Sequence, residues 1–492
     1  MSNQTKHWLS KKIKDVNERK ASSIDPSKYP EETFELFSVP IFPTGIAEIV
    51  QGKDIGSTKQ IVKPGDVLLC KINPRINRVW VVSEPKGFRQ IASSEWIVVR
   101  SSVHNDRFLK YFFQEGTFRD LLCSDVSGVG GSLTRAKPKL VNEYEVVVAP
   151  LAEQKRIVEK LDEVLAQVDT IKARLDGIPD LLKRFRQSVL AFAVSGKLTE
   201  EWRKDNSSEF PDVNTISQEL FDDGTTKGNF GNKSARAEAI KDDELQKYKS
   251  IYPLIRVGEV SGCIVPNRDK PKTFSGDTPW ILTPYLNDQS IELRSEQIEL
   301  GLSSSEIELY NARVIPSDSV IMTCVGRLGL SAVNEFKCVI NQQLHAFTCG
   351  KHIYSRYLAF SIRAMENYFC SAATSTTVQY LNKTACNSMP LPLPSIEEQK
   401  EIVRLVDQYF AFADTIEAQV KKAQARVDNL TQSILAKAFR GELVAQDPND
   451  EPADKLLERI AEARKEAEAL AKAAKKAEAA KKRAAKKAAE NS

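Results

Sequence analysis

Hydrophobic positions recur every three or four residues along two long stretches of the chain, residues 150–200 and residues 395–445, and each stretch predicts an extended amphipathic helix. A sustained repeat of about 3.5 residues requires a partner helix to cover its apolar seam, and the obvious partner of each stretch is the other one. Gly177 and Pro179 interrupt the first stretch, where we expect a kink because proline removes a helical hydrogen bond. The predicted coiled-coil seam consists of Ile157, Leu161, Val164, Val168, Ile171, Leu175, Leu182, Ile402, Val406, Tyr409, Ile416, Val420, Val427 and Leu430.

The two stretches are also copies of each other, at a constant offset of 245 residues. Glu153-Gln154-Lys155 recurs as Glu398-Gln399-Lys400, and about eighteen of some forty-six aligned positions are identical without a gap. The alternative interpretation is that each copy is an ordinary amphipathic helix packed on its own domain. Two copies in the same phase, separated by a whole domain, favour pairing of the two helices with each other in a coiled coil.

A segment of short strand-like runs precedes each predicted helix, over residues 1–149 and residues 250–394. Each segment continues into a short helix, a loop rich in Ser, Thr or Gly, and a final strand. The two loops, residues 127–135 and 373–380, fall at the same 245-residue offset. We therefore predict an α+β protein in which two mixed α/β domains share one plan but differ in sequence.

Two further segments lack this pattern. Residues 201–249 are rich in Asp, Lys, Gly, Asn and Ser, which predicts a linker or a partly disordered insertion. Residues 446–492 form an Ala/Lys/Glu-rich tail of strong helix formers with little apolar seam, which predicts a solvated helix.

Composition adds little evidence for a partner. The formal net charge is +4, and the stretch Glu451–Ser492, with about twelve Lys/Arg against about eight Asp/Glu, accounts for all of it, so that bulk charge does not by itself indicate nucleic-acid binding. The eight cysteines form no CxxC pair, which suits a reducing compartment. No apolar run approaches the length that spans a bilayer, and we expect a cytoplasmic protein without a membrane partner.

Two catalytic alternatives remain open as hypotheses. Asp318, Glu335 and Lys337 are spaced as in some metal-dependent nucleases, although the pattern is loose. A zinc site could be drawn from Cys338, His345, Cys349 and His352, but its spacing matches no standard structural site. The chain has no GxxxxGK[ST] motif and no Asn-Pro-Pro-aromatic motif, so we expect neither a cofactor, a bound metal nor a catalytic residue in this chain.

The chain resembles the specificity subunits of type I restriction-modification systems over nearly its whole length. The resemblance rests on PLAEQK at Pro150–Lys155, LPSIEEQK at Leu393–Lys400, SVLAFAVSGKL at Ser188–Leu198, SILAKAFRGEL at Ser433–Leu443, YPLIRVGE at Tyr252–Glu259, TCVGRLG at Thr323–Gly329 and INQQ at Ile340–Gln343. The first domain departs from the pattern, because its apparent opening at Phe34–Pro40 lacks a Tyr-Pro-Leu motif.

The resemblance implies a non-catalytic subunit that reads double-stranded DNA. Each of its two target-recognition domains would read one half of a bipartite, asymmetric site across a spacer, and the two long helices would pair antiparallel between the domains. Two methyltransferase subunits and restriction subunits would join it, and these partners would use S-adenosylmethionine, ATP and magnesium. A coiled-coil scaffold that binds only proteins is the alternative.

Candidate DNA contacts are basic, amide and hydroxyl side chains near the predicted loops, because Lys and Arg hold phosphates while polar groups reach base edges. In the first domain these are Lys71, Arg75, Arg78, Ser132, Thr134, Arg135 and Lys137. In the second domain they are Arg327, Gln342, Gln343, Thr374, Ser375, Thr376, Gln379 and Tyr380.

Overall fold

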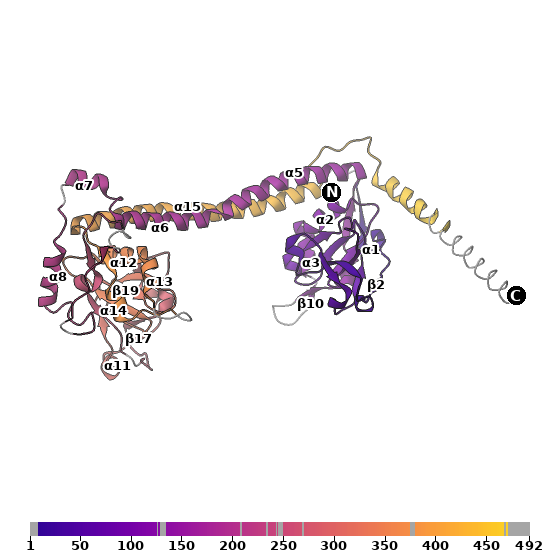
Figure 1. The fold of residues 1–492 in the computed structure, drawn as a ribbon. Coiled ribbons are helices and arrows are strands. Elements are labelled where there is room, and N and C mark those ends of the chain that lie inside the picture. The colour runs from indigo at the N-terminus through magenta and orange to yellow at the C-terminus, as the bar shows by residue number, and fades with distance from the viewer. Residues whose placement is uncertain are drawn as a thin grey trace. The chain divides into compact units, whose positions relative to one another are not determined.

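The computed structural model describes residues 8–124, 126–127, 134–206, 209–232, 235–242, 244, 249–267, 270–373, 379–466 and 469–470. The chain divides into two compact units (Figure 1). The first unit comprises Met1–Asp176 with Lys422–Ser492, and the second comprises Gly177–Lys421. Helix α15, Ile396–Phe439, contributes its first part to the second unit and its last part to the first.

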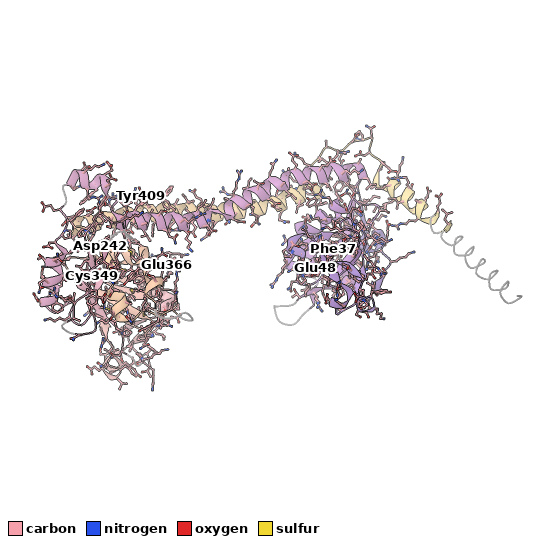
Figure 2. The ribbon with its side chains drawn as sticks, viewed as in Figure 1. Phe37, Glu48, Asp242, Cys349, Glu366 and Tyr409 are labelled. Carbon is pink, nitrogen blue, oxygen red and sulfur yellow. The ribbon has the colours of Figure 1, made fainter. Side chains whose placement is uncertain are left out.

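The first unit combines small sheets with short helices and one long helix, α5. A five-stranded sheet has the order β2-β5-β8-β3-β4 and a three-stranded sheet the order β7-β6-β9. Phe37, which is labelled in Figure 2, belongs to the core that the two sheets share. It packs edge-on against Trp80, with 4.9 Å between the ring centroids. The strands are β1 (Leu9–Lys12), β2 (Ser23–Ile24), β3 (Thr33–Phe37), β4 (Glu48–Gln51), β5 (Lys59–Ile61), β6 (Val67–Cys70), β7 (Val79–Val81), β8 (Arg89–Ala92), β9 (Trp96–Val99), β10 (Val126–Ser127), β11 (Arg135–Ala136) and β12 (Glu145–Val148), and the helices are α1 (Ile13–Val16), α2 (Asp106–Gln114), α3 (Gly116–Ser124), α4 (Pro138–Val141) and α5 (Leu151–Asp176).

The second unit has the same plan with a different sheet content. A five-stranded sheet has the order β14-β22-β19-β20-β16, and a four-stranded sheet has the order β17-β15-β21-β18. The strands are β13 (Leu254–Arg256), β14 (Gly262–Ile264), β15 (Thr278–Ile281), β16 (Glu292–Leu293), β17 (Gly301–Leu302), β18 (Val314–Ile315), β19 (Ser319–Thr323), β20 (Ser331–Asn334), β21 (Cys338–Ile340), β22 (Leu344–Thr348) and β23 (Pro390–Pro392), and the helices are α6 (Ile178–Ser195), α7 (Glu200–Asn206), α8 (Val213–Asp222), α10 (Val257–Val260), α11 (Ser304–Leu309), α12 (Ser355–Ala364), α13 (Glu366–Ala372) and α14 (Lys383–Asn387). The chain is therefore of the α+β class, with long helices beside mixed domains.

Within each unit, a long helix lies beside part of α15 and runs in the opposite direction. In the first unit, Lys172 of α5 pairs with Asp428 at 2.9 Å, and Asp176 accepts a hydrogen bond from Gln424 at 2.8 Å. In the second unit, Arg186 of α6 pairs with Asp414 at 2.6 Å, and the Phe185 ring lies 6.2 Å from the ring of Tyr409.

The expected kink is a helix boundary. Helix α5 ends at Asp176, and Gly177 caps the start of α6, with Pro179 in the first turn of α6. Proline is accepted there because the first amide groups of a helix have no partner within the helix.

The predicted seam residues differ in burial. Ile157, Leu161, Val168, Leu182, Ile402, Val406 and Val420 are buried, Val164, Leu175, Ile416 and Val427 are half-buried, and Ile171, Tyr409 and Leu430 are exposed. Ile402 and Val406 belong to the core of the second unit's own domain. The start of each repeat therefore packs against its own domain, as the alternative interpretation proposed.

The repeated Glu, Gln and Asp of the two copies fasten each long helix to its domain. Buried Gln154 accepts a hydrogen bond from the Asn105 amide at 2.7 Å and donates to the carbonyls of Val103 and Ala149 at 3.0 and 2.7 Å. Buried Gln399 accepts from the Tyr354 amide at 2.8 Å and donates to His352 and Pro394 at 3.0 Å each. Each glutamine therefore holds three backbone groups of its own domain.

Two carboxylates of each copy also bind groups of its domain. Glu153 accepts from the Trp8 indole at 2.9 Å, and Glu398 accepts from the Tyr252 hydroxyl at 2.6 Å. Farther along, Asp162 pairs with Arg107 at 2.6 Å, and its counterpart Asp407 pairs with Arg356 at 3.0 Å. We call Glu153, Gln154 and Asp162, with Glu398, Gln399 and Asp407, the anchoring residues.

The anchoring contacts locate the start of the first domain, which the sequence pattern had left open. Strand β1 follows Trp8 and pairs antiparallel with β12, as β13 follows Tyr252 and pairs with β23. The counterpart of the Tyr-Pro-Leu opening is therefore Trp8-Leu9-Ser10, and not the segment at Phe34, because an indole replaces the phenol as the donor to the anchoring glutamate.

Two segments expected to be separate from the domains pack on them instead. Helix α8 lies within the predicted linker, and its Ile216 and Leu220 are buried in the core of the second unit. In the tail, residues 453–466 are helical, and Ala453 is buried in a core of the first unit with Leu457 packed against it. A few apolar residues in each segment therefore supply a docking face despite its polar composition.

Removing an anchoring glutamine should destabilise the unit that contains it. Gln154→Ala leaves one amide and two carbonyls without their partners, and we expect a loss of about 2–4 kcal/mol in the free energy of unfolding of the first unit. Gln167→Ala, an exposed position on the same helix, is the matched control. Urea unfolding monitored by fluorescence measures both, and equal stability of the two variants would contradict the assignment.

Candidate nucleic-acid interface

The C-terminal end of β6 in the first unit is held by a network of backbone hydrogen bonds. The Lys71 amide donates to Glu95 at 3.0 Å, and the Lys71 carbonyl accepts from the Ala136 amide at 2.8 Å. The Asn73 amide donates to Thr134 at 2.8 Å, and Ile72 forms a bridge with Arg135. Three stretches far apart in sequence thus meet at one strand end.

The end of β19 in the second unit repeats this network bond for bond. The Cys324 amide donates to Gln343, its carbonyl accepts from Leu381, and the Gly326 amide donates to Gln379, each at 2.9 Å. Val325 forms a bridge with Tyr380. We call the two networks the strand-end frameworks. They use backbone groups alone, so the side chains on them are free to differ.

The strand-end framework of the first unit carries a basic surface. Lys71, Arg135, Lys137 and Lys139 line one open cavity of about 590 Å³, and Glu95 pairs with Arg135 at 3.2 Å. Because one carboxylate faces four cations, this surface has a net positive charge and suits a phosphate backbone.

A tight turn beside this surface projects Arg75 and Ile76 into solvent. The turn, Pro74–Ile76, is flanked by Asn73 and Asn77, whose φ angles of 47° and 48° lie in the left-handed region. Ile76 is 52% exposed, although it is large and apolar. Asparagine tolerates this conformation better than most residues, and positive φ angles are frequent at binding sites.

The remaining predicted residues of the first unit occupy supporting positions. Arg78 precedes β7, and its carbonyl accepts from the Cys70 amide at 3.0 Å. Thr134 contributes its carbonyl to the strand-end framework. Ser132 lies outside the described residues, as do Thr374, Ser375 and Thr376 of the second unit.

The strand-end framework of the second unit presents amide and aromatic groups in place of a basic surface. Gln379 and Tyr380 are exposed there, and Gln343 accepts from the Thr283 hydroxyl at 3.0 Å. Gln342 donates to the Asn267 carbonyl at 3.0 Å. Arg327 forms a two-pronged ion pair with Asp288, so its charge is already neutralised.

Sequence analysis missed Lys139, which lies two residues beyond Lys137 in the basic surface. The alternation Lys-Pro-Lys at residues 137–139, directly after a loop expected to contact DNA, was the available signal. It also missed the anchoring role of the repeated carboxylates, which identity between the copies alone could not reveal.

The structure does not assemble the proposed zinc site. Among the described residues, no group of three or more His, Cys, Asp or Glu side chains is placed to hold a metal ion, which contradicts the zinc hypothesis. His345 instead contacts the Cys386 thiol at 3.3 Å, and His352 lies 3.5 Å from Glu219. Asp318 of the nuclease pattern accepts a hydrogen bond from Ser355.

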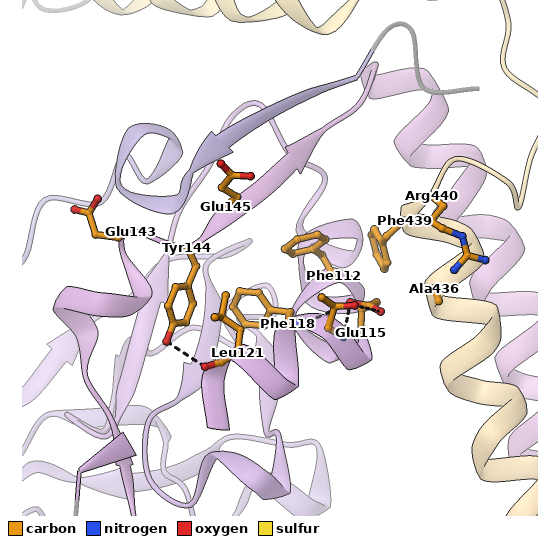
Figure 3. Close-up of a pocket in the computed structure, with 11 residues that line it drawn as sticks. Phe112, Glu115, Phe118, Leu121, Glu143, Tyr144, Glu145, Ala436, Phe439 and Arg440 are labelled. Carbon is orange, nitrogen blue, oxygen red and sulfur yellow. Dashed lines mark hydrogen bonds between the residues drawn. The ribbon is translucent and has the colours of Figure 1, made fainter. Parts of the chain in front are cut away.

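A second cavity of the first unit, of about 550 Å³, does not resemble a phosphate site. Its walls include four aromatic rings and three carboxylates, and Tyr144 donates to the Leu121 carbonyl at 3.3 Å (Figure 3). The rings belong to Phe112, Phe118, Tyr144 and Phe439, and the carboxylates to Glu115, Glu143 and Glu145. Its one arginine, Arg440, pairs with Glu442 at 2.9 Å. Aromatic packing of this kind holds the end of α15 on the domain.

No helix in the described part of the chain combines the length and apolar composition that crossing a membrane requires.

Comparisons with known proteins agree on one family. A family model described as the type I restriction modification DNA specificity domain matches residues 250–424. The chain is 32% identical over 402 residues to the type I restriction enzyme EcoBI specificity subunit of Escherichia coli, which covers 75% of this chain and 74% of that protein. It is 34% identical over 373 residues to the EcoKI specificity subunit of Escherichia coli strain K12, covering 73% and 71%.

Solved structures share the fold at low sequence identity. The HsdS subunit from Thermoanaerobacter tengcongensis aligns with a TM-score of 0.52 and 19% identity, over 90% of this chain and 99% of that one. A chain from a structure described as "Structural basis underlying complex assembly and conformational transition of the type I R-M system" aligns with a TM-score of 0.63 and 19% identity, over 90% and 100%.

The buried histidines should make both units sensitive to mild acid. Burial lowers the pKa of His104 in the first unit and of His345 in the second to about 4, so the folded state keeps both neutral. The unfolded chain takes up these protons below about pH 6.5, and each histidine should therefore cost about 2 kcal/mol of stability between pH 7 and pH 5. Urea unfolding at both pH values measures this loss.

The variant His345→Gln should lose correspondingly less stability between the same two pH values, because it has no proton to take up at that position. His352→Gln, at a half-buried site outside the core, is the control. Added zinc should stabilise none of these proteins. A pH dependence that is unchanged in His345→Gln would refute the prediction.

Proposed function

This chain belongs to the family of type I restriction enzyme specificity subunits, and we propose that it reads a bipartite, asymmetric DNA sequence with an unspecified spacer. Specificity subunits are the non-catalytic DNA-recognition components of restriction-modification complexes. One target-recognition domain would lie in residues 1–149 and the other in residues 250–394. The observation that carries the proposal is that unlike side chains stand on identical strand-end frameworks in the two units.

The two frameworks support the reading of two different half-sites. In the first unit the side chains are Lys71, Arg135 and Lys137, and in the second they are Gln343, Gln379 and Tyr380. Arginine pairs best with guanine in the major groove, and glutamine with adenine. An asymmetric site follows, because one backbone geometry presents different chemistry to each half.

The long helices would set the distance between the half-sites. We propose that α5, α6 and α15 form a single antiparallel coiled coil with pseudo-twofold symmetry between the domains. The support is that the paired helices run in opposite directions within each unit and that the helix repeats share one sequence.

Catalysis and cofactors would belong to partner subunits. Two methyltransferase subunits, one at each end of the pseudo-symmetric chain, would use S-adenosylmethionine, and restriction subunits would use ATP and magnesium. A protein-only scaffold, the alternative from another class, leaves the basic surface of the first unit without a role.

Mapping methylated bases in cells that carry this chain and its methyltransferase tests the function and the role of the helices together. The unaltered chain should yield one bipartite, asymmetric motif. Insertion of four residues after Lys172 and four after Asp428, which face each other, adds about 6 Å to the rod and should lengthen the spacer by about one to two base pairs. A continuous motif would refute the bipartite reading, and an unchanged spacer would refute the role of the helices.

Arg135→Ala should weaken or relax the reading of one half-site and leave the other intact. The loss of one base contact costs about 1–3 kcal/mol at the affected position. Competition binding with duplexes substituted in each half-site measures it, with Arg89→Ala, an exposed arginine of the same unit that pairs with Glu32, as the control. Unchanged affinity and sequence preference would remove Arg135 from the interface.

A further inference from the structure

A polar cavity of about 400 Å³ lies in the first unit between the Pro74–Ile76 turn and the long helices. The turn contributes Ile76 and Asn77, and the domain contributes Lys110 of α2 and Arg119 of α3. Helix α15 contributes Gln432. The cavity and the basic surface of Lys71, Arg135, Lys137 and Lys139 lie next to the same loop, residues 71–77.

Two cations of this cavity have no carboxylate partner. Among the ion pairs of the described residues, none includes Lys110 or Arg119, and both side chains are half-buried. The nearby Asp162 is already bound to Arg107 and Tyr111, at 2.6 Å each. The remaining carboxylate of the lining, Asp169, is exposed to solvent. The cavity therefore favours an anion.

Three residues that line this cavity each have a buried polar atom without a hydrogen-bond partner. These atoms are Nε of Arg119, Oδ1 of Asn77 and Oε1 of Gln432. An unpartnered buried polar atom costs about 1–3 kcal/mol, so several in one cavity mark a place that a ligand or ordered water completes. A half-turn of either amide would present an NH₂ donor instead of an oxygen, and an oxyanion can accept from each of these groups.

Burial also disfavours the charged form of Lys110. It lowers the pKa of Lys110, and the neighbouring Arg107 adds to the effect. A bound anion would offset both the lost hydration of Lys110 and its repulsion from Arg107, because it provides a direct charge contact.

We propose that this cavity binds a phosphodiester group of the DNA strand, with Lys110 and Arg119 as its ligands. The proposal rests on the proposed DNA-binding function, and it adds two contacts outside the strand-end framework. A strand that follows the basic surface past the exposed turn reaches the cavity next, because both border the same loop.

In the corresponding cavity of the second unit, the arginines already have hydrogen-bond or ion-pair partners. This cavity measures about 460 Å³ and contains Gln187, the repeat counterpart of Gln432. Its Arg186 pairs with Asp414 and Glu417, and Arg327 pairs with Asp288. Arg363 donates to backbone carbonyls, among them Ser290 at 2.7 Å and Asn287 at 2.8 Å. Its arginines are thus already engaged, and the proposal concerns the first unit alone.

The test is the salt dependence of DNA binding by the full-length protein. Fluorescence anisotropy with a duplex carrying the mapped site and with an unrelated duplex gives affinity across a range of KCl concentrations. Lys110→Gln and Arg119→Gln should each weaken binding to both duplexes by a similar factor and reduce the slope of log affinity against log salt by about one, and the double variant by about two.

Lys160→Gln removes an exposed lysine of α5 that pairs with Glu163, and it should leave the slope unchanged. Matching unfolding curves for all variants exclude a folding defect. If the parent binds duplex DNA and both cavity variants keep its slope, the cavity holds only water and the inference fails while the proposed function stands. If the parent binds no DNA, the proposed function itself fails.

Inorganic phosphate distinguishes a DNA strand from a free anion. The stabilities of the parent and the double variant are compared in phosphate and in chloride at equal ionic strength. If phosphate stabilises only the parent, and parent and variants have equal salt slopes for DNA binding, the cavity takes a free anion. That outcome overturns the assignment to DNA. Reduced slopes in the variants support the assignment.

Discussion

The fold depends on one constraint, the fastening of each mixed domain to the start of a long helix by buried polar groups. Gln154 and Gln399 satisfy three backbone groups each, and these groups would otherwise be buried without partners where the domain meets the helix. A buried amide with all its hydrogen bonds made is specific in direction, unlike apolar contact. Each domain therefore has one defined orientation on its own helix, as a reader of DNA sequence requires.

The anchoring residues also explain why the helices were copied so faithfully while the domains diverged. Glu153, Gln154 and Asp162 contact positions that both domains supply, namely a donor at the domain's opening, a helix start and an arginine. The strand-end frameworks also stay the same while side chains differ, because they consist of backbone hydrogen bonds. A duplicated chain can in this way keep its frame and change what it recognises.

The two units differ more in surface charge than in the backbone geometry of their strand-end frameworks. The first unit exposes Lys71, Arg135, Lys137 and Lys139 against one carboxylate, whereas Arg327 of the second unit is neutralised by Asp288. The near-neutral charge of the chain outside its tail is therefore an average over unlike surfaces. Local charge, and not the total, carries the indication of a nucleic-acid partner.

Periodicity and the internal repeat predicted much of the secondary structure. The strand-like runs expected before each long helix are strands in the structure, among them Val67–Cys70 and Trp96–Val99, and α15 follows the second helical stretch. The one short helix expected in each domain is two helices in the structure, α2 and α3 with a break at Glu115, and α12 and α13 with a break at Met365. Such breaks depend on packing against the sheet, which a helical pattern does not contain.

The sequence by itself determined the duplicated architecture, because an exact offset and a conserved helical phase survive in the order of residues alone. Only the tertiary structure decided that Trp8 opens the first domain, that α8 and residues 453–466 belong to the cores, and that Lys110, Arg119 and Gln432 share one cavity. These facts join residues that lie tens to hundreds of positions apart. Contacts of that range arise from how sheets and helices pack, and local propensity does not encode them.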